Sequence, residues 1–216
     1  MQFSLDRDRL IRLMKEQAEI GGTDAGGLNR VALSDADKKA RDWLLNKMEA
    51  AGLSTRIDAF GNMFGRRRGT DETASTILLG SHLDSQPFGG IYDGALGVVA
   101  ALEFILSLND ANIKTKRPIE IVNWTNEEGS RFQSVMQGSG VWAGELNLET
   151  EYAVTDSEGR SVESELERIG YKGNVAAKPT TEYGSAIEFN IDQGPRMKNS
   201  DADVGFVTVV VGLSGG

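Results

Sequence analysis

The chain has 216 residues, of which 39% are hydrophobic and 25% are charged, so it is long enough to bury a substantial core. Its net charge of −9 and its pI near 4.8 argue against binding to a nucleic-acid backbone, which calls for basic patches. It contains one histidine and no cysteine, which excludes disulfides and leaves oxygen atoms and one imidazole as metal ligands.

The N-terminal segment is charged throughout and lacks the apolar stretch and cleavage site of a secretory signal. No apolar run approaches the ~20 residues of a membrane span. We therefore expect a cytoplasmic protein without a membrane partner.

Two amphipathic helices are predicted first. One begins after Ser4 and ends near Gly21. Its inward face is formed by Leu10, Ile11, Met14 and Ala18. The other is capped by Ser34 and ends at Gly52. Its inward face is formed by Ala36, Ala40, Trp43, Leu44 and Met48. Short strands over 54–58 and 62–66 follow.

The only histidine comes directly after residues 76–81, an apolar run that is typical of a buried strand. Asp84 follows two positions later, on the same face of an extended backbone, where its carboxylate can orient the ring of His82. A loop with Gly and Pro leads to Asp93, just before an apolar helix predicted over 95–108. His82 and Asp93 are thus expected at the mouth of a strand–loop–helix unit, where open α/β sheets bind ligands. Alternatively, Asp93 caps that helix.

A second buried strand, over 119–122, leads to the adjacent carboxylates of Glu127 and Glu128. Neighbouring carboxylates repel each other, so they need water or a cation. The same stretch also fits the start of a helix, because Thr125 and Glu128 have the spacing of a capping box. Both interpretations stay open on these residues alone.

The rest of the chain predicts helices over 137–146 and 161–169, a strand over 186–192, a turn at 193–195 and a strand over 204–211. Two strand ends then present His82, Asp84 and Asp93 on one side and the Glu127–Glu128 pair on the other. This arrangement suits a two-metal hydrolase, in which one carboxylate bridges the ions and a free carboxylate takes a proton from water.

Four motifs resemble the amidase, hydantoinase/carbamoylase family: GSHLDSQPFGGIYDGALGVVAALE, NWTNEEGSRF, QGSGVWAG and IDQGP. This family includes N-carbamoyl-L-amino-acid amidohydrolases, β-ureidopropionases and allantoate amidohydrolases, and it belongs to a superfamily of dinuclear zinc aminoacylases and exopeptidases. The resemblance implies an α/β fold with a mixed sheet flanked by helices, of which residues 1–216 form the N-terminal part of the catalytic domain. It implies hydrolysis of a small linear amide, first of all the ureido group of an N-carbamoyl-L-amino acid.

The resemblance also implies roles and a cofactor of two zinc ions, or manganese. His82 ligates one metal, Asp93 bridges both, Glu128 ligates the second, Glu127 is the general base and Gln193 contacts substrate. Asp84 is not a ligand itself, but its carboxylate orients the ring of His82.

Two departures from the family pattern bear on activity. Asn190 stands where the family usually has a histidine, in NIDQGP instead of HIEQGP. The family chain also continues into a lid domain, used for dimerisation and for binding the substrate carboxylate, and then returns with its last histidine ligand. We therefore expect weak or incomplete metal binding and no lid-mediated dimer. The alternatives are a catalytically silent binding or structural module, an allantoate amidohydrolase and a dipeptidase.

Overall fold

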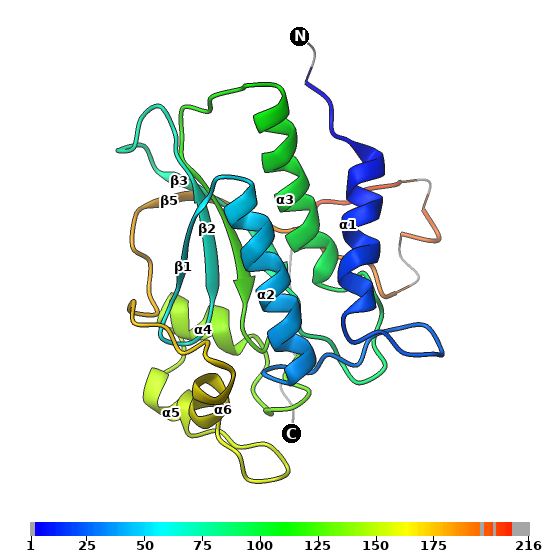
Figure 1. The fold of residues 1–216 in the computed structure, drawn as a ribbon, viewed down its shortest axis with the longest axis vertical. Helices are drawn as coiled ribbons and strands as arrows, with labels where there is room; N and C mark the ends of the chain where they lie inside the picture. The colour runs from blue at the N-terminus through cyan, green and yellow to red at the C-terminus, as the bar shows by residue number, and fades with distance from the viewer. Residues whose placement is uncertain (1–2, 195–196, 201, 209–216) are drawn as a thin grey trace.

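The computed structural model describes residues 3–194, 197–200 and 202–208. One mixed sheet contains five strands in the order β1-β2-β4-β3-β5 (Figure 1). β1, β2 and β4 pair antiparallel, whereas β3 pairs parallel with β4 and with β5. Their bounds are Ser54–Ile57 for β1, Met63–Arg67 for β2, Thr76–His82 for β3, Ile119–Trp124 for β4 and Tyr183–Ile187 for β5.

Three long helices cover one face of this sheet (Figure 1). They are α1 (Arg7–Glu19), α2 (Asp35–Ala50) and α3 (Ala95–Asp110). α2 packs on β1 and β2, α3 packs on β3 and β4, and α1 packs on α3. Three short helices follow β4, namely α4 (Gln137–Ala143), α5 (Leu148–Tyr152) and α6 (Val162–Ile169). The predicted class, a mixed sheet flanked by helices, is confirmed.

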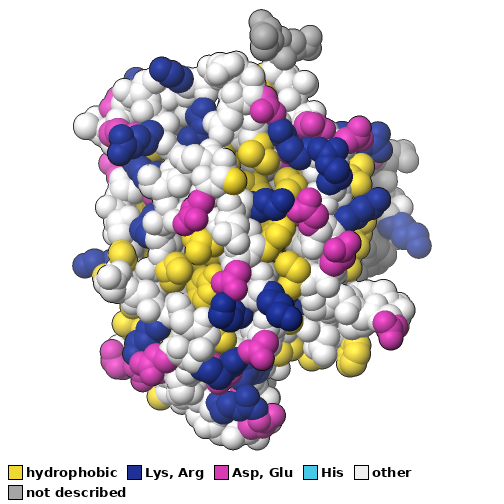
Figure 2. Space-filling model, in the orientation of Figure 1, with side chains coloured by type: hydrophobic (Ala, Val, Ile, Leu, Met, Phe, Trp, Pro, Cys, Tyr) yellow, Lys and Arg dark blue, Asp and Glu magenta, His cyan; other side chains and the backbone are white. Residues whose placement is uncertain are grey.

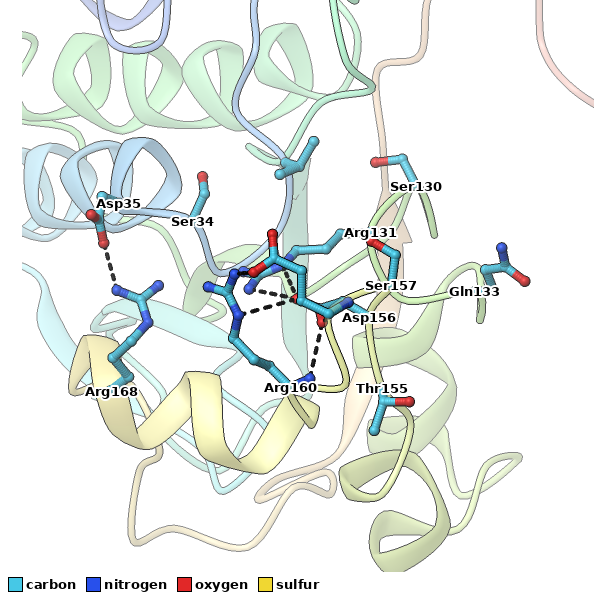
Figure 3. Close-up of a pocket in the computed structure, with 12 residues that line it drawn as sticks. Ser34, Asp35, Ser130, Arg131, Gln133, Thr155, Asp156, Ser157, Arg160 and Arg168 are labelled. Carbon is cyan, nitrogen blue, oxygen red and sulfur yellow. Dashed lines mark hydrogen bonds and ion pairs between the residues drawn. The ribbon is translucent and has the colours of Figure 1, made fainter.

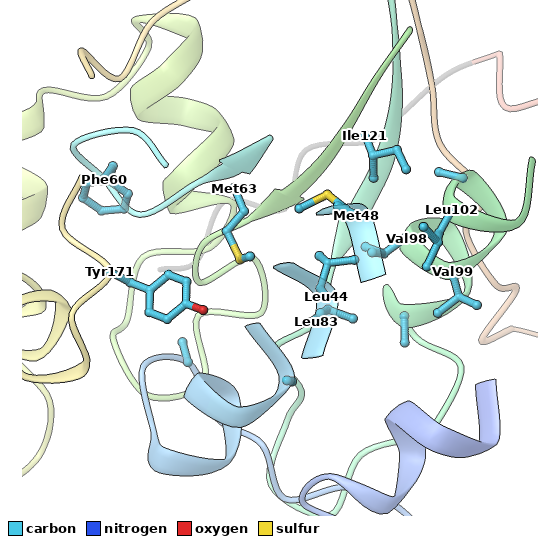
Figure 4. Packing of buried hydrophobic residues seen from close by; sticks show 14 of the residues in the cluster. Leu44, Met48, Phe60, Met63, Leu83, Val98, Val99, Leu102, Ile121 and Tyr171 are labelled. Carbon is cyan, nitrogen blue, oxygen red and sulfur yellow. The ribbon is translucent and has the colours of Figure 1, made fainter. Parts of the chain in front are cut away.

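The main core lies between the long helices and the sheet (Figure 4). Leu44 and Met48 of α2 and Leu102 of α3 are fully buried there with Ile121 of β4. Each such side chain contributes about 1.5–3 kcal/mol when it leaves water. Because side chains alternate along a strand, Val122 points to the opposite face of the sheet and belongs to a second cluster.

That opposite face combines aromatic and charged side chains. Phe64 and Val122 are buried there, and Trp142 of α4 packs against them. Glu120 accepts two hydrogen bonds from Arg56, at 2.8 and 3.1 Å, and one from the hydroxyl of Tyr183 at 2.6 Å. The carboxylate is therefore neutralised where it is buried within the sheet.

The start of α1 differs from the prediction. Its N-cap is Asp6 instead of Ser4, and the Asp6 carboxylate accepts from the Arg9 N–H at 2.9 Å. The inward face differs too, since Ile11 is 40% exposed while Leu13 is buried. The inward face differs because the guanidinium of Arg9 binds Glu103 of α3 at 2.6 Å. This ion pair fixes the rotation of α1 about its own axis.

Several other elements agree closely with the prediction. Ser34 caps α2 and accepts from the N–H of Asp37 at 3.2 Å, and Ser161 caps α6. β1 to β4 begin and end within two residues of the expected bounds. α4 is shorter than expected, and the five-residue helix α5 was not foreseen.

The predictions for the C-terminal segment are wrong in their bounds. β5 is the stretch 183–187, and residues 188–192 form no strand. Its pairing with β3 ends at Leu79 opposite Ile187, after which the carbonyl of Phe189 lies close to Gly97 of α3. Residues 204–208 form no strand, and 209–211 lie outside the described residues, as does Pro195 of the expected turn.

The surface seen in Figure 2 carries Lys and Arg side chains interspersed with Asp and Glu, over the face covered by the long helices. On this face the basic side chains drawn do not gather into one patch, in line with the negative net charge. No helix among the described residues is long and apolar enough to cross a membrane.

Candidate metal centre

The end of β3 places the ring of His82 against the start of α3. A β-carbon at Gly94, the N-cap residue with a φ of 62°, would collide with this ring, so only glycine fits there. The Nδ1 atom of His82 lies 2.9 Å from the main-chain carbonyl of Asp84. A protonated Nδ1 thus leaves Nε2 to face the site, where Oε2 of Glu127 lies 3.3 Å away.

Asp84 lies beside His82 as predicted, but its carboxylate has a different use. Its Oδ1 is 3.7 Å from Nδ1, so the carbonyl of Asp84 and not its side chain takes the closest contact with the ring. The carboxylate instead accepts from the main-chain N–H groups of Glu127, at 3.2 Å, and Glu128, at 3.3 Å. One buried aspartate thereby links the ends of β3 and β4.

The Glu127–Glu128 pair lies in a loop, so the capping-box interpretation is wrong: no helix begins at Thr125. The N–H of Met136 donates to the carbonyl of Glu127 at 2.7 Å, which closes the loop. Inside it, the amide of Asn126 donates to the carbonyls of Phe132 and Ser134, each at 3.1 Å. These bonds hold both carboxylates at the end of β4.

His82, Asp93 and Glu128 come together, with one ligand atom from each lying within 4.8 Å of the others. Asp93 does not cap α3, because Gly94 occupies the N-cap position and no side chain bonds there. One imidazole and two carboxylates fit zinc or manganese, and three protein ligands with an open position are typical of catalytic zinc sites. The donor set therefore fits one divalent cation.

Two further side chains contact this cluster. The amide of Gln193 donates to the carboxylate of Asp93, and the amide of Gln86 donates to that of Glu128 at 3.0 Å. Gln193 was predicted at the site, whereas Gln86 was not, although its place in the loop between His82 and Asp93 could have indicated it. Asn190 lies three residues before Gln193 with an exposed side chain.

Burial and charge set the electrostatics of the centre. Burial raises the pKa of Glu127, and the carboxylates of Asp84 and Glu128 raise it further against the opposing charge of His82. Burial lowers the pKa of His82, but the charges of Asp84 and Glu127 raise it more, so the pKa lies above its ordinary value. A carboxylate with a raised pKa is well suited to take up a proton near neutral pH.

A polar hollow of about 730 Å³ lies beside the Glu127–Glu128 loop (Figure 3). Its arginines are paired, since Arg131 contacts Asp156 at 2.9 Å and Glu165 at 2.6 Å, and Arg168 contacts Asp35 at 2.5 Å. These ion pairs hold the segment that follows the Glu127–Glu128 loop in place. Because the arginines are neutralised by carboxylates, the hollow offers no excess positive charge to a ligand.

Known proteins match both the sequence and the fold. The sequence model of peptidase family M28 matches residues 62–199. An N-carbamoyl-L-amino-acid amidohydrolase of Rhizobium meliloti is 46% identical over 211 residues, covering 97% of this chain and 50% of that protein. A ureidoglycolate hydrolase of Oryza sativa is 35% identical over 215 residues, covering 96% of this chain and 44% of that protein.

A solved structure agrees with these relatives. The crystal structure of a hydantoinase/carbamoylase family amidase from Burkholderia ambifaria has a TM-score of 0.88 and 43% identity, covering 91% of this chain and 47% of that one. The chain thus spans about half the length of the relatives it matches.

An α/β fold that brings one imidazole and two carboxylates together at its strand ends fits the class of metal-dependent hydrolases. The chain belongs to peptidase family M28, and it matches the hydantoinase/carbamoylase amidases over about half of their length, which confirms the family that its motifs predicted.

Proposed function

We propose that this chain carries the metal-binding and proton-transfer residues for hydrolysis of a linear amide, the ureido group of an N-carbamoyl-L-amino acid. The observation that carries the proposal is the convergence of His82, Asp93 and Glu128, with Glu127 beside them. The names of the relatives from Rhizobium meliloti and Geobacillus stearothermophilus support this substrate class.

In this proposal His82, through Nε2, and the carboxylates of Asp93 and Glu128 hold a divalent cation. When bound, such a cation polarises the substrate carbonyl and makes water easier to deprotonate. A second cation, which the family resemblance implies, would share the carboxylate of Asp93. Gln193, already in contact with Asp93, is placed to contact substrate.

Glu127 acts as the base and stays unliganded. It takes a proton from the attacking water and passes it to the amino-acid nitrogen when the bond from that nitrogen to the ureido carbon breaks. The amino acid leaves, and the remaining carbamic acid decomposes into carbon dioxide and ammonia. The raised pKa of Glu127, caused by burial and neighbouring carboxylates, suits this transfer.

Glu127→Gln tests this assignment. We expect the substitution to abolish ammonia release from N-carbamoyl-L-amino acids in the presence of zinc or manganese while metal content stays unchanged, because a base acts on water. The matched control is Glu163→Gln, which alters a half-exposed glutamate paired with Lys172. Equal activity of wild type and Glu127→Gln contradicts the role, and loss of metal would make Glu127 a ligand.

Product analysis separates the other candidates. The rice relative favours a ureido acid such as ureidoglycolate or the related allantoate as a second substrate class. Amino-acid release from a dipeptide without ammonia would identify a dipeptidase. A silent module, which the amide at Asn190 favours, would release nothing with any of these substrates.

A further inference from the structure

Arg30 is among the largest fully buried side chains of the protein, and the metal centre described above gives it no role. Burial lowers the pKa of Arg30 to about 10, although the negative charges of Asp37 and Asp84 raise it in part. The guanidinium therefore stays protonated at neutral pH. All four of its side-chain hydrogen bonds within the described residues go to uncharged oxygens. Burying a charge in this way is costly, so the position of Arg30 needs a structural reason.

The guanidinium joins the end of α1 to the end of β3. Its Nε donates to the carbonyl of Leu83 at 2.7 Å. Its Nη1 donates to the carbonyls of Gln17 and Ile20 at 2.8 and 2.9 Å, and its Nη2 donates to the side chain of Gln17 at 2.7 Å. The last carbonyls of a helix favour a nearby cation, so α1 holds the guanidinium in place for Leu83.

The main chain of Arg30 binds the same segment. Its N–H donates to the hydroxyl of Ser85 at 3.0 Å, and its carbonyl accepts from the Ser85 N–H at 2.9 Å. Leu83 and Ser85 flank Asp84, whose carbonyl lies 2.9 Å from Nδ1 of His82. Arg30 therefore fixes both neighbours of the group that orients the histidine.

We propose that Arg30 is a positioning residue for the metal centre: it holds residues 83–85 so that the Asp84 carbonyl keeps the ring proton of His82 on Nδ1 and leaves Nε2 to the cation. The inference rests on the metal centre of the proposed function, but not on its catalytic activity. The hydrogen bond at one ring nitrogen decides which nitrogen binds the metal, and losing such support typically costs about 10–100-fold in metal affinity.

Three variants weaken this support to different degrees. Arg30→Lys keeps the charge but loses the planar fork of donors, and Arg30→Met keeps the length without charge. Ser85→Ala removes the hydroxyl that accepts from the Arg30 N–H and donates to the carbonyl of Gln86 at 2.9 Å. The matched control is Arg56→Lys, because Arg56 binds Glu120 and lies on β1, which β2 and β4 separate from β3.

Two measurements read out the position of His82. Calorimetric titration with zinc gives the affinity, and the ¹⁵N–¹H spectrum of imidazole groups reports on His82 alone, because the chain has one histidine. We expect Arg30→Lys and Arg30→Met to lower zinc affinity about 10–100-fold and Ser85→Ala to lower it less. In alkaline, metal-free buffer all three should have a smaller share of the Nδ1–H tautomer than wild type. Arg56→Lys should change neither readout.

The proposal is overturned if Arg30→Lys and Ser85→Ala fold and keep both the zinc affinity and the tautomer of the wild type. These two variants decide the matter if Arg30→Met fails to fold. It is also overturned if Arg56→Lys lowers zinc affinity as much as Arg30→Lys, because the effect is then one of stability alone. Wild type without zinc affinity would contradict the proposed function, whereas the tautomer, measured without metal, still decides the role of Arg30.

Discussion

Asn190 carries an amide at the position where the family pattern has an imidazole, and its side chain is exposed. An amide oxygen is a weaker zinc ligand than an imidazole nitrogen. We expect Asn190→His to tighten zinc binding at least about tenfold, or about 1.4 kcal/mol, in a calorimetric titration. Asn190→Gln, which keeps an amide, should leave the affinity unchanged. Equal affinities of both variants would show that residue 190 does not face the cation.

The residues of the centre differ in how far the sequence could reveal them. His82, Asp93 and the Glu127–Glu128 pair could be placed at one end of the sheet, because they lie at or after strand ends or before an apolar helix, whereas the choice of Glu128 as a ligand came from the family resemblance. Arg30 could not be predicted, and for Gln86 only its place in the loop after His82 was visible, since their contacts with Leu83 and Glu128 are far away in the sequence. Local pattern carries no information about such partners.

The junction between β3 and α3 depends on a single glycine. Gly94→Ala places a methyl group against the ring of His82 and forces alanine to a φ of 62°. We expect a loss of at least about 1–2 kcal/mol of unfolding free energy from the backbone alone, together with weaker zinc binding, because a φ of 62° with a ψ of −48° is no easier for alanine than the left-handed helical region. Chemical denaturation and calorimetry measure the two effects.

Gly170→Ala is the matched control, because Gly170 has a φ of 75° but nothing within 4 Å of an added β-carbon. Gly170→Ala should lose about 1–2 kcal/mol of unfolding free energy, because Gly170 lies in the left-handed helical region, and it should keep the zinc affinity of the wild type. If Gly94→Ala also keeps that affinity, the close contact with His82 has no bearing on the centre.

The predicted bounds of helices and strands differ in accuracy, because some depend on neighbouring residues and others on distant ones. The cap at Ser34 was predicted from the sequence, because the capping residue and the helix it starts are neighbours, and the helix predicted to begin at Ser161 has that residue as its cap. The end of β5 was not visible, because residues 188–192 alternate like a strand but have no partner beyond Leu79 of β3. Pairing is a property of two segments and cannot be read from one.

Across the whole molecule, Glu103 ties α1 to α3 and makes stability depend on pH. Its buried carboxylate accepts from Arg9 at 2.6 and 3.0 Å and from Ser107 at 2.6 Å. Burial raises the pKa of Glu103, but these partners lower it more, so it lies below its ordinary value of 4.5. Because the pKa is lower in the folded state, the carboxylate stabilises the fold above about pH 4.5, and this contribution is lost as the pH falls through the folded-state pKa.

We expect Glu103→Gln to lower the free energy of unfolding by about 1.5–3 kcal/mol at neutral pH and by progressively less below about pH 4. Urea denaturation across this pH range measures the difference from wild type. Glu167→Gln, at an exposed pair with Lys172, should cost at most about 1 kcal/mol. A difference for Glu103→Gln that grows as the pH falls would reverse the sign argued here.

The proposed metal centre depends on His82 and its neighbouring carboxylates forming a cation site. The most direct measurement is calorimetric titration of zinc into metal-free wild type and His82→Ala. We predict saturable but weak binding by wild type, with no tightly held second ion, and loss of that binding in His82→Ala. Tight binding of two zinc ions by wild type, or equal binding by His82→Ala, would contradict the account.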